Sequence, residues 1–409
     1  MPGELEAAFR EEWPRILGSV LRFTGDLQLA EDAVQEAFVR ALAQPAGVLR
    51  NPASWITTAA KRIAVDTVRR DAGLARSYGR VAADLAVRSA GEAVEEGRDP
   101  FAATIDDERL ELLFLACHPE LPEEARLALA LRTVCGVPTE QIAELLLVKR
   151  ATVAARLTRA KKRIVAAGLR FEPPDGVLLA ERADDVLTIV HLLYTAGHTT
   201  LDGPRVSSQL ITAAALSLAR SMVRLLPRHL EARGLLGLVL CTEARAPGRT
   251  DDAGRLLSLE EADRSRWDRS MLEEGLTQAT IALAGRGRFA LQAGISGLHA
   301  RAATWEQTDW VSIAALYDTL AAVWPSPAVL LGRILARSRL AGADLDEAAR
   351  AVEALRTDAD GALGRQCLAA IGELRRRQGR PAEAGAAYRL AIADEPNEAV
   401  RAFLERQVI

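Results

Sequence analysis

A run of basic side chains near the middle of the chain could bind nucleic acid. Between Lys149 and Arg170 there are eight basic residues and no acidic one. Arginine can bind guanine through two hydrogen bonds, and contacts from lysine and arginine to phosphates supply most of the non-specific affinity for DNA. On a helix, one flank would carry Thr152, Arg156, Arg159 and Arg163. This directional charge favours DNA recognition over the alternative, a solvated face on an ordinary helix.

The elements that would position these side chains lie within residues 139–164. The pattern predicts a short helix, a tight turn and a longer basic helix, which is the layout of a helix-turn-helix. Thr139, which follows Pro138, is a suitable N-cap for the first helix. The buried face of that helix would be Ile142, Ala143 and Leu146. The second helix has one apolar stripe, made of Val153, Leu157, Ala160 and Ile164. The other side of the second helix is therefore available to enter a DNA major groove.

Composition limits the class of protein. The chain has 409 residues, of which 49% are apolar and 4% aromatic, and this predicts an all-α protein of two or three domains. The net charge is −3, so nucleic-acid binding must depend on local patches. The four cysteines are far apart and match no zinc or redox spacing, which predicts reduced, mostly buried thiols in a cytoplasmic protein. The sequence shows no signal peptide and no apolar run long enough to span a membrane, so we expect no membrane partner.

Residues 1–72 are predicted to form one unit of tightly packed helices. Apolar residues keep helical spacing from Ala30 to Leu42, and the other side of that helix carries Glu31, Asp32, Gln35, Glu36 and Arg40. A ten-residue loop from Ala43 to Pro52 follows. Asn51-Pro52 is then expected to begin a helix that ends at Arg69-Arg70.

A flexible acidic linker is predicted over residues 73–104, followed by a second helical unit over residues 105–171. Between Asp84 and Glu108 there are eight acidic and two basic residues, and low hydrophobicity with net charge favours flexibility. The second unit ends with the helix-turn-helix.

Residues 177–409 are predicted to be helical throughout, with loops at Gly203-Pro204, Ala246–Gly254 and Pro325–Pro327. A repeat is visible, because residues of similar type recur at one spacing in Tyr317, Leu320 and Pro325, in Tyr388, Ala391 and Pro396, and in Ala219, Met222 and Pro227. Gly372 precedes Ala384 by twelve positions, which completes a set that resembles the tetratricopeptide (TPR) pattern. We therefore expect a TPR-like helical array, a fold whose curved surface usually binds a protein or peptide.

The two N-terminal units together resemble an extracytoplasmic-function (ECF) sigma factor of the sigma-70 family, over about residues 5–170. Residues 31–38, Glu-Asp-Ala-Val-Gln-Glu-Ala-Phe, are similar to the region 2 helix that docks on the clamp helices of RNA polymerase. Residues 51–55 and 60–70 are similar to the segment that melts and reads the −10 promoter element. Residues 139–164 are similar to region 4, which reads the −35 element.

The remainder, about residues 180–409, resembles the extension of an ECF subgroup with a TPR-like C-terminal domain. The matching stretches are residues 263–268, 291–293 and 308–318. This part of the resemblance implies a regulatory domain with a possible protein partner of its own.

The resemblance implies three sets of contacts. Core RNA polymerase would be bound by Asp32, Gln35 and Glu36. The single strand of the −10 element would be bound by Asn51, Trp55, Lys61, Arg62, Arg69 and Arg70. The −35 duplex would be bound by Lys149, Arg150, Thr152, Ala155, Arg156, Arg159, Lys162 and Arg163. The loop over residues 43–52 could hold a flipped base, on which Trp55 could stack unless it belongs to the core.

Three positions depart from the family pattern. Arg62 stands where asparagine is common, Leu147 where the turn usually has glycine, and Ala154 where many members carry a basic, base-reading side chain. The promoter sequence therefore cannot be copied from better-known members.

Enzyme motifs are missing from the sequence. It contains no P-loop, no dinucleotide-binding glycine motif and no H-E-x-x-H, and its five histidines are scattered, so we expect no catalysis, no metal and no other cofactor. We expect a sigma factor that directs core polymerase to specific promoters and opens them, with a C-terminal domain that regulates it in cis or binds a partner. Two alternatives remain: a TPR interaction protein that does not bind polymerase, and a helix-turn-helix regulator that binds duplex DNA without melting it.

Overall fold

The structure, a computed structural model, describes residues 2–44, 51–74, 104–146, 148–169, 181–198, 208–357 and 361–408. In these ranges the regular elements are helices, and one isolated β-bridge joins Thr250 to Leu256. The predicted all-α class is therefore confirmed. The chain divides into two compact units, residues 1–193 with 213–221, and residues 194–212 with 222–409. None of the described helices is both long and apolar enough to cross a membrane.

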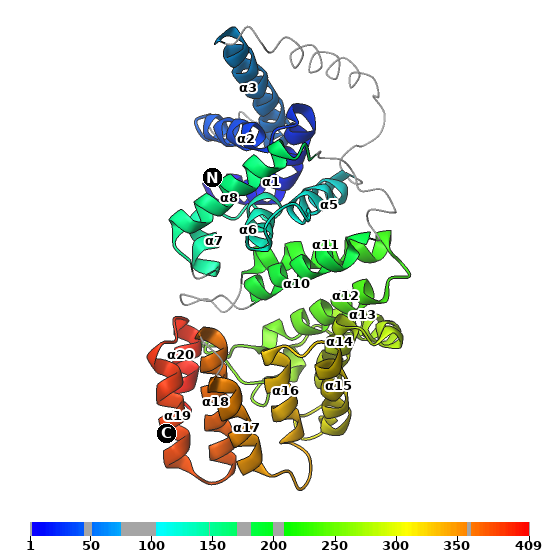
Figure 1. The fold of residues 1–409 in the computed structure, drawn as a ribbon, viewed down its shortest axis with the longest axis vertical. Helices are drawn as coiled ribbons and strands as arrows, with labels where there is room; N and C mark the ends of the chain where they lie inside the picture. The colour runs from blue at the N-terminus through cyan, green and yellow to red at the C-terminus, as the bar shows by residue number, and fades with distance from the viewer. Residues whose placement is uncertain are drawn as a thin grey trace. The chain divides into compact units, whose positions relative to one another are not determined.

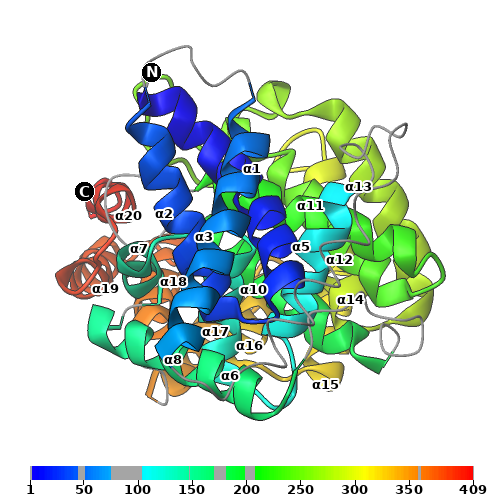
Figure 2. The same cartoon turned by 90° about the horizontal axis from the view of Figure 1, so that it is seen from above.

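Three helices at the start of the first unit pack on one another: α1 (Pro2–Thr24), α2 (Leu27–Leu42) and α3 (Pro52–Leu74). They are drawn in blue in Figure 1, and α2 and α3 lie side by side there and in Figure 2. Gly25, with φ +68°, ends α1, and the Asp26 carboxylate caps α2. Asn51 caps α3 as predicted, because its Oδ1 accepts from the Ser54 backbone N at 3.1 Å. The helix continues past Arg70 to Leu74, since no glycine or proline interrupts it before the last turn.

The next described helices are α5 (Thr104–Ala116), α6 (Glu123–Thr133), α7 (Thr139–Leu145) and α8 (Arg150–Ala166). The last two, α7 and α8, form the predicted helix-turn-helix. The apolar stripe of α8 is buried as predicted, against α6 and α7. On α7, Ile142 and Ala143 are buried, and Leu146, which directly follows the helix, is half-buried. The Val148 backbone N donates to the Ala143 carbonyl at 3.0 Å and closes the turn, while Leu147 lies outside the described residues. The predicted linker also lies outside them, apart from its ends at Leu74 and Thr104.

Two further helices, α10 (Ala183–His198) and α11 (Gln209–Leu225), contribute residues to both units. The second unit continues with α12 (Leu230–Glu243), α13 (Arg269–Ala282), α14 (Arg288–Arg301), α15 (Trp310–Val323), α16 (Pro327–Arg337), α17 (Leu345–Thr357), α18 (Gly361–Arg377), α19 (Pro381–Ala393) and α20 (Glu398–Glu405). Helices adjacent in sequence pack together, as Figure 1 shows for α17, α18 and α19. Close packing depends on glycine: a Cβ on Gly372 of α18 would lie 2.8 Å from the Tyr388 ring of α19.

One prediction for this part was wrong in extent. The loop expected at Ala246–Gly254 continues to Asp268, with only two short 3₁₀ turns, Ala246–Gly248 and Arg264–Arg266. Local side-chain acceptors satisfy its backbone, because the Asp251 carboxylate accepts from the backbone N of Ala253 and Arg255. Such bonds compete with helix formation. The loop predicted at Pro325–Pro327 is present between α15 and α16, and Gly203-Pro204 lies outside the described residues.

Candidate nucleic-acid interface

The predicted docking face consists of Asp32, Gln35 and Glu36, and all three are exposed on α2. Asp32 accepts two hydrogen bonds from Gln28 Nε2, at 2.9 and 2.8 Å. Glu36 Oε1 lies 2.9 Å from Arg40 Nε. Exposed pairs of this kind contribute only about 0–1 kcal/mol, so both carboxylates can exchange these partners for groups on another protein.

The residues predicted to bind the −10 strand lie along α3. Arg62, Arg69 and Arg70 are exposed, and Arg62 and Arg69 share one side of the helix, since they are seven positions apart. Lys61 is half-buried, with its Nζ 5.8 Å from the centre of the Phe23 ring. Asn51 is exposed, although its side chain caps the helix.

Trp55 is half-buried, which fits neither a fully buried core residue nor a fully exposed stacking platform. The predicted base pocket can be followed only at its ends, since residues 45–50 lie outside the described residues.

The basic side chains of α8 fall into two groups. Ala155, Arg159 and Lys162 are exposed opposite the buried stripe, together with Lys149, which forms the N-cap. The others are engaged within the unit: Arg150 lies 2.7 Å from Glu140, Arg156 lies 3.2 Å from Glu124, Arg163 pairs with Glu120, and Thr152 is half-buried. Arg156 is only 20% exposed. The set of basic side chains on α8 that faces outward without an acidic partner within the unit is therefore smaller than the sequence pattern indicates.

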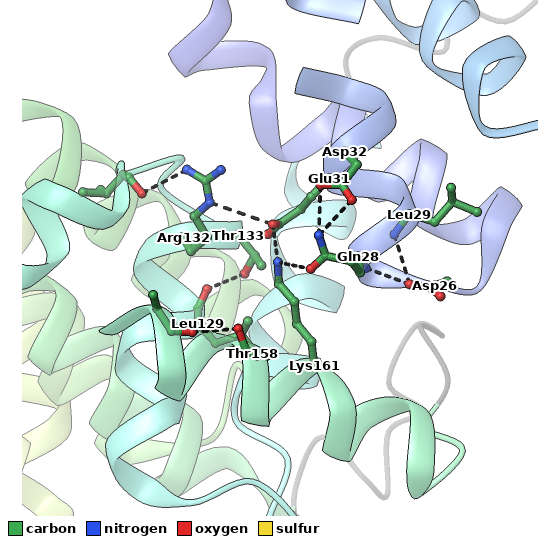
Figure 3. A network of polar contacts seen from close by, with 12 residues as sticks. Asp26, Gln28, Leu29, Glu31, Asp32, Leu129, Arg132, Thr133, Thr158 and Lys161 are labelled. Atoms are coloured by element: carbon green, nitrogen blue, oxygen red, sulfur yellow. Dashed lines mark hydrogen bonds and ion pairs between the residues drawn. The ribbon is translucent and has the colours of Figure 1, made fainter. Parts of the chain in front are cut away.

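A polar network that the sequence did not reveal joins α2 to α8, and Figure 3 shows Lys161 extending from α8 toward Gln28 and Glu31 of α2. Lys161 Nζ lies 2.6 Å from Glu31 Oε2 and 2.9 Å from Gln28 Oε1. Arg132 Nε, from α6, lies 4.0 Å from the same Glu31 oxygen. We call Gln28, Glu31, Arg132 and Lys161 the Glu31 network.

Glu31 was expected on the polar side of its helix, and this expectation was wrong. The residue is 2% exposed, and its Oε1 has no hydrogen-bond partner. The Lys161 side chain is 14% exposed, so water screens the pair little. When one partner of a buried ion pair is removed, the charge left behind is destabilising by about 3–5 kcal/mol.

Other contacts join α1 to the second of the two predicted N-terminal units. Arg22 of α1 lies 3.3 Å from the buried carboxylate of Glu111 on α5. Gly136, with φ +64°, lies against the Trp13 ring, where an added Cβ would be 3.2 Å from ring atoms. The two predicted N-terminal units thus form one compact unit, in which the predicted docking helix and recognition helix are linked by a buried charge pair.

Within the residues that the structure describes, no group of three or more His, Cys, Asp or Glu side chains could hold a metal ion. Burial raises the pKa of the Cys117 thiol, and His118 Nδ1 accepts from the Glu120 backbone N at 3.1 Å. Cys117-His118 is therefore a buried thiol beside a helix-end histidine rather than a nucleophile with its base.

Family models match three parts of the chain. Sigma-70 region 2 matches residues 8–73, and sigma-70 region 4 matches residues 111–164. A family of unknown function, DUF6596, matches residues 182–283. The region 2 match covers α2 and α3, and the region 4 match covers α6, α7 and most of α8.

One similar protein matches nearly the whole chain, and others match only a part of it. An uncharacterized protein of Rhizobium meliloti is 37% identical over 99% of this chain and 95% of its own length. The RNA polymerase sigma-H factor of Pseudomonas aeruginosa is 32% identical over 37% of this chain and 78% of its own length. The probable ECF RNA polymerase sigma factor SigI of Mycobacterium tuberculosis is 30% identical, and the match spans 54% of its length. No solved structure matches the chain. With both sigma regions matched in order, the chain belongs to the extracytoplasmic-function sigma factors of the sigma-70 family.

Proposed function

We propose that this sigma factor directs core RNA polymerase to specific promoters and opens them with the residues described above. Members of the family are non-enzymatic initiation factors that bind core polymerase and promoter DNA, and the assignment of residues is what we add. The docking face of α2 binds polymerase, the arginines of α3 follow the single −10 strand, and α8 reads the −35 duplex. The protein acts in the cytoplasm and catalyses no reaction itself.

The observation that carries the −35 assignment is the outward face of α8. Arg159 and Lys162 are exposed there, beside Ala155, whose small side chain lets the backbone approach base edges. The opposite stripe is buried and fixes the orientation of the helix. Arg159 is the most suitable base-reading residue, because its side chain is exposed and, among the described residues, its Nε bonds only the Ala155 carbonyl of its own helix, at 3.3 Å.

We further propose that the Glu31 network holds the free protein in a closed state, which polymerase binding opens. The −10 and −35 elements are separated along the DNA, so the helices that bind them, α3 and α8, must also move apart. Glu31 directly precedes Asp32 of the docking face. A partner bound to that face would therefore disturb the buried pair between Glu31 and Lys161. Binding to the open state would shift the equilibrium toward it.

The C-terminal part, residues 177–409, is proposed to be a TPR-like domain that regulates the sigma part in cis. Its length exceeds that of the sigma part, and the Rhizobium meliloti relative extends over both parts. Truncation after residue 172 should therefore change transcription strongly, and fragments 1–172 and 177–409 should associate when mixed. Normal transcription from the truncated chain, without association of the fragments, would refute regulation in cis.

The docking assignment is tested with a Gln35→Ala, Glu36→Ala double variant. Both side chains are exposed, so folding should be unchanged while affinity for core polymerase falls. Asp66→Ala, which removes an exposed carboxylate from α3, is the matched control. If a binding titration gives the double variant the same affinity as the control, the docking face is not where polymerase binds.

A further inference from the structure

The second unit contains a cavity, lined by both polar and apolar side chains, that the sigma function does not use. It has a volume of about 180 Å³ and lies between the end of α12 and the irregular segment before α13. Its polar lining includes His198, Thr242, Arg245, Arg249, Ser258 and Trp267. All six residues fall within the part of the chain that matches a family of unknown function.

Positive charge in this cavity is only partly compensated. Arg245 Nε donates to the Cys241 carbonyl at 3.0 Å, and its Nη2 donates to Ser296 Oγ at 3.1 Å, so neither partner carries a charge. Arg249 Nη1 donates to the His198 carbonyl at 2.8 Å. Burial lowers the pKa of both Arg245 and Arg249, which marks the loss of hydration around them. Both residues are half-buried, and arginines withdrawn from water are ordinarily paired with a carboxylate or another anion.

The nearby carboxylate of Glu243 already has other partners. Its Oε1 accepts from the Tyr194 hydroxyl at 2.9 Å and lies 3.3 Å from His198 Nδ1. Glu243 therefore offsets one positive charge at most, whereas two arginines line the cavity. Arg264, close enough to lower the pKa of Arg245, adds to the positive potential.

A neutral donor at the same cavity has no hydrogen-bond partner among the described residues. Trp267 is 3% exposed, and its Nε1 makes no hydrogen bond to any described residue. Gly248 packs closely against this nitrogen, because a Cβ added there would lie only 2.6 Å from Nε1. A buried N–H normally has an acceptor, so this donor points to an acceptor that the described residues do not supply.

We propose that this cavity binds a small organic anion through a phosphate or carboxylate group. The guanidinium groups of Arg245 and Arg249 supply charge and hydrogen bonds, and the Trp267 indole N–H supplies a further donor to the same oxygens. The cavity is smaller than the roughly 300–1,000 Å³ of pockets for drug-sized ligands, so the ligand is a small metabolite. The site gives the C-terminal domain a chemical signal to respond to.

The test is a titration of the full-length protein, labelled with ¹⁵N at its six tryptophans. Inorganic phosphate and succinate are the probes, and potassium chloride at equal ionic strength is the reference. One indole resonance, which Trp267→Phe removes, should shift saturably with at least one probe. A response to phosphate alone identifies a phosphate ester, and a response to succinate alone identifies a carboxylate.

Arg249→Met should raise the probe concentration at the titration midpoint roughly tenfold or more, because it removes the guanidinium group that binds the anion. Arg266→Met, in the same segment but outside the cavity lining, is the matched control and should respond like the original protein. If circular dichroism shows that Arg249→Met is unfolded, Arg249→Lys replaces it, with the same direction expected. No saturable shift with either probe, or an unchanged midpoint in the Arg249 variant, would overturn the proposal.

Discussion

Replacing Lys161 with methionine should open the contact between α2 and α8 while leaving the docking face intact. Methionine retains a flexible apolar side chain but lacks the ammonium that lies 2.6 Å from Glu31 Oε2. Glu31 would then keep only Arg132 at 4.0 Å as a charged partner within the network, with its Oε1 still unbonded. The closed state would therefore contain a buried carboxylate with little compensation.

The size of the effect follows from burial. Loss of one partner from a buried pair costs about 3–5 kcal/mol, and we take roughly 2–3 kcal/mol here because Arg132 remains nearby. Since about 1.4 kcal/mol is a factor of ten, the ratio of open to closed protein should rise by roughly 30- to 150-fold. The variant should accordingly bind core polymerase more tightly, because opening the closed state requires less free energy.

Opening can be measured by energy transfer between dyes on Val39→Cys and Val165→Cys. Both valines are 61% exposed, and the four native cysteines are buried, so labelling is selective. Transfer should fall in Lys161→Met, and unlabelled Lys161→Met should bind core polymerase more tightly than the unsubstituted protein. Lys162→Met removes the same charge from an exposed neighbour and is the control. If the two variants agree in both energy transfer and polymerase affinity, the Glu31 network does not control opening.

Three further outcomes can be measured. In the holoenzyme, Arg159→Ala should weaken binding to a −35 duplex by about 1–3 kcal/mol and relax preference at one base pair, and unchanged anisotropy titrations would refute base reading. Burial lowers the pKa of His299 from 6.5 to about 4. As the pH drops from 6.5 toward 4, His299 therefore binds a proton in the unfolded state but not in the folded state, and the stability of the folded state falls. The pKa difference of about 2.5 units corresponds to about 3 kcal/mol, so urea unfolding should show that His299→Phe loses less stability over this pH range than the unsubstituted protein, by roughly that amount. Finally, a thiol reagent should modify none of the four buried cysteines until urea unfolds the protein, because burial also raises their pKa, to about 12 for Cys135; rapid native modification would contradict this.

Local patterns in the sequence predicted most features of the sigma helices, although α3 continues beyond Arg70 to Leu74. The stripe from Val153 to Ile164 defines the buried side of α8, and the side chain of Asn51 caps α3. Both features depend on residues within a few turns of one another, so a single sequence contains the information. The exposure of the docking face on α2 follows from the same periodicity.

The Glu31 network could not be predicted, because it depends on distant pairing. Glu31 lies at the edge of the apolar stripe of α2, next to Phe38 around the helix, where either exposure or burial is possible. Its burial is decided by Lys161, which is 130 positions away in the sequence. The irregular segment before α13 extends further than predicted because local aspartate bonds satisfy its backbone in place of helical ones.

Promoter opening in vitro tests the central claim most directly. Full-length protein and core RNA polymerase are incubated with a library of randomised promoter sequences, transcripts are sequenced, and the selected promoters are probed with permanganate for unpaired thymines. We predict transcripts from a defined promoter class and reactive thymines at the −10 position, both reduced by the Gln35→Ala, Glu36→Ala double variant. Bound duplex without reactive thymines or transcripts would contradict the account and identify a helix-turn-helix regulator that does not melt DNA.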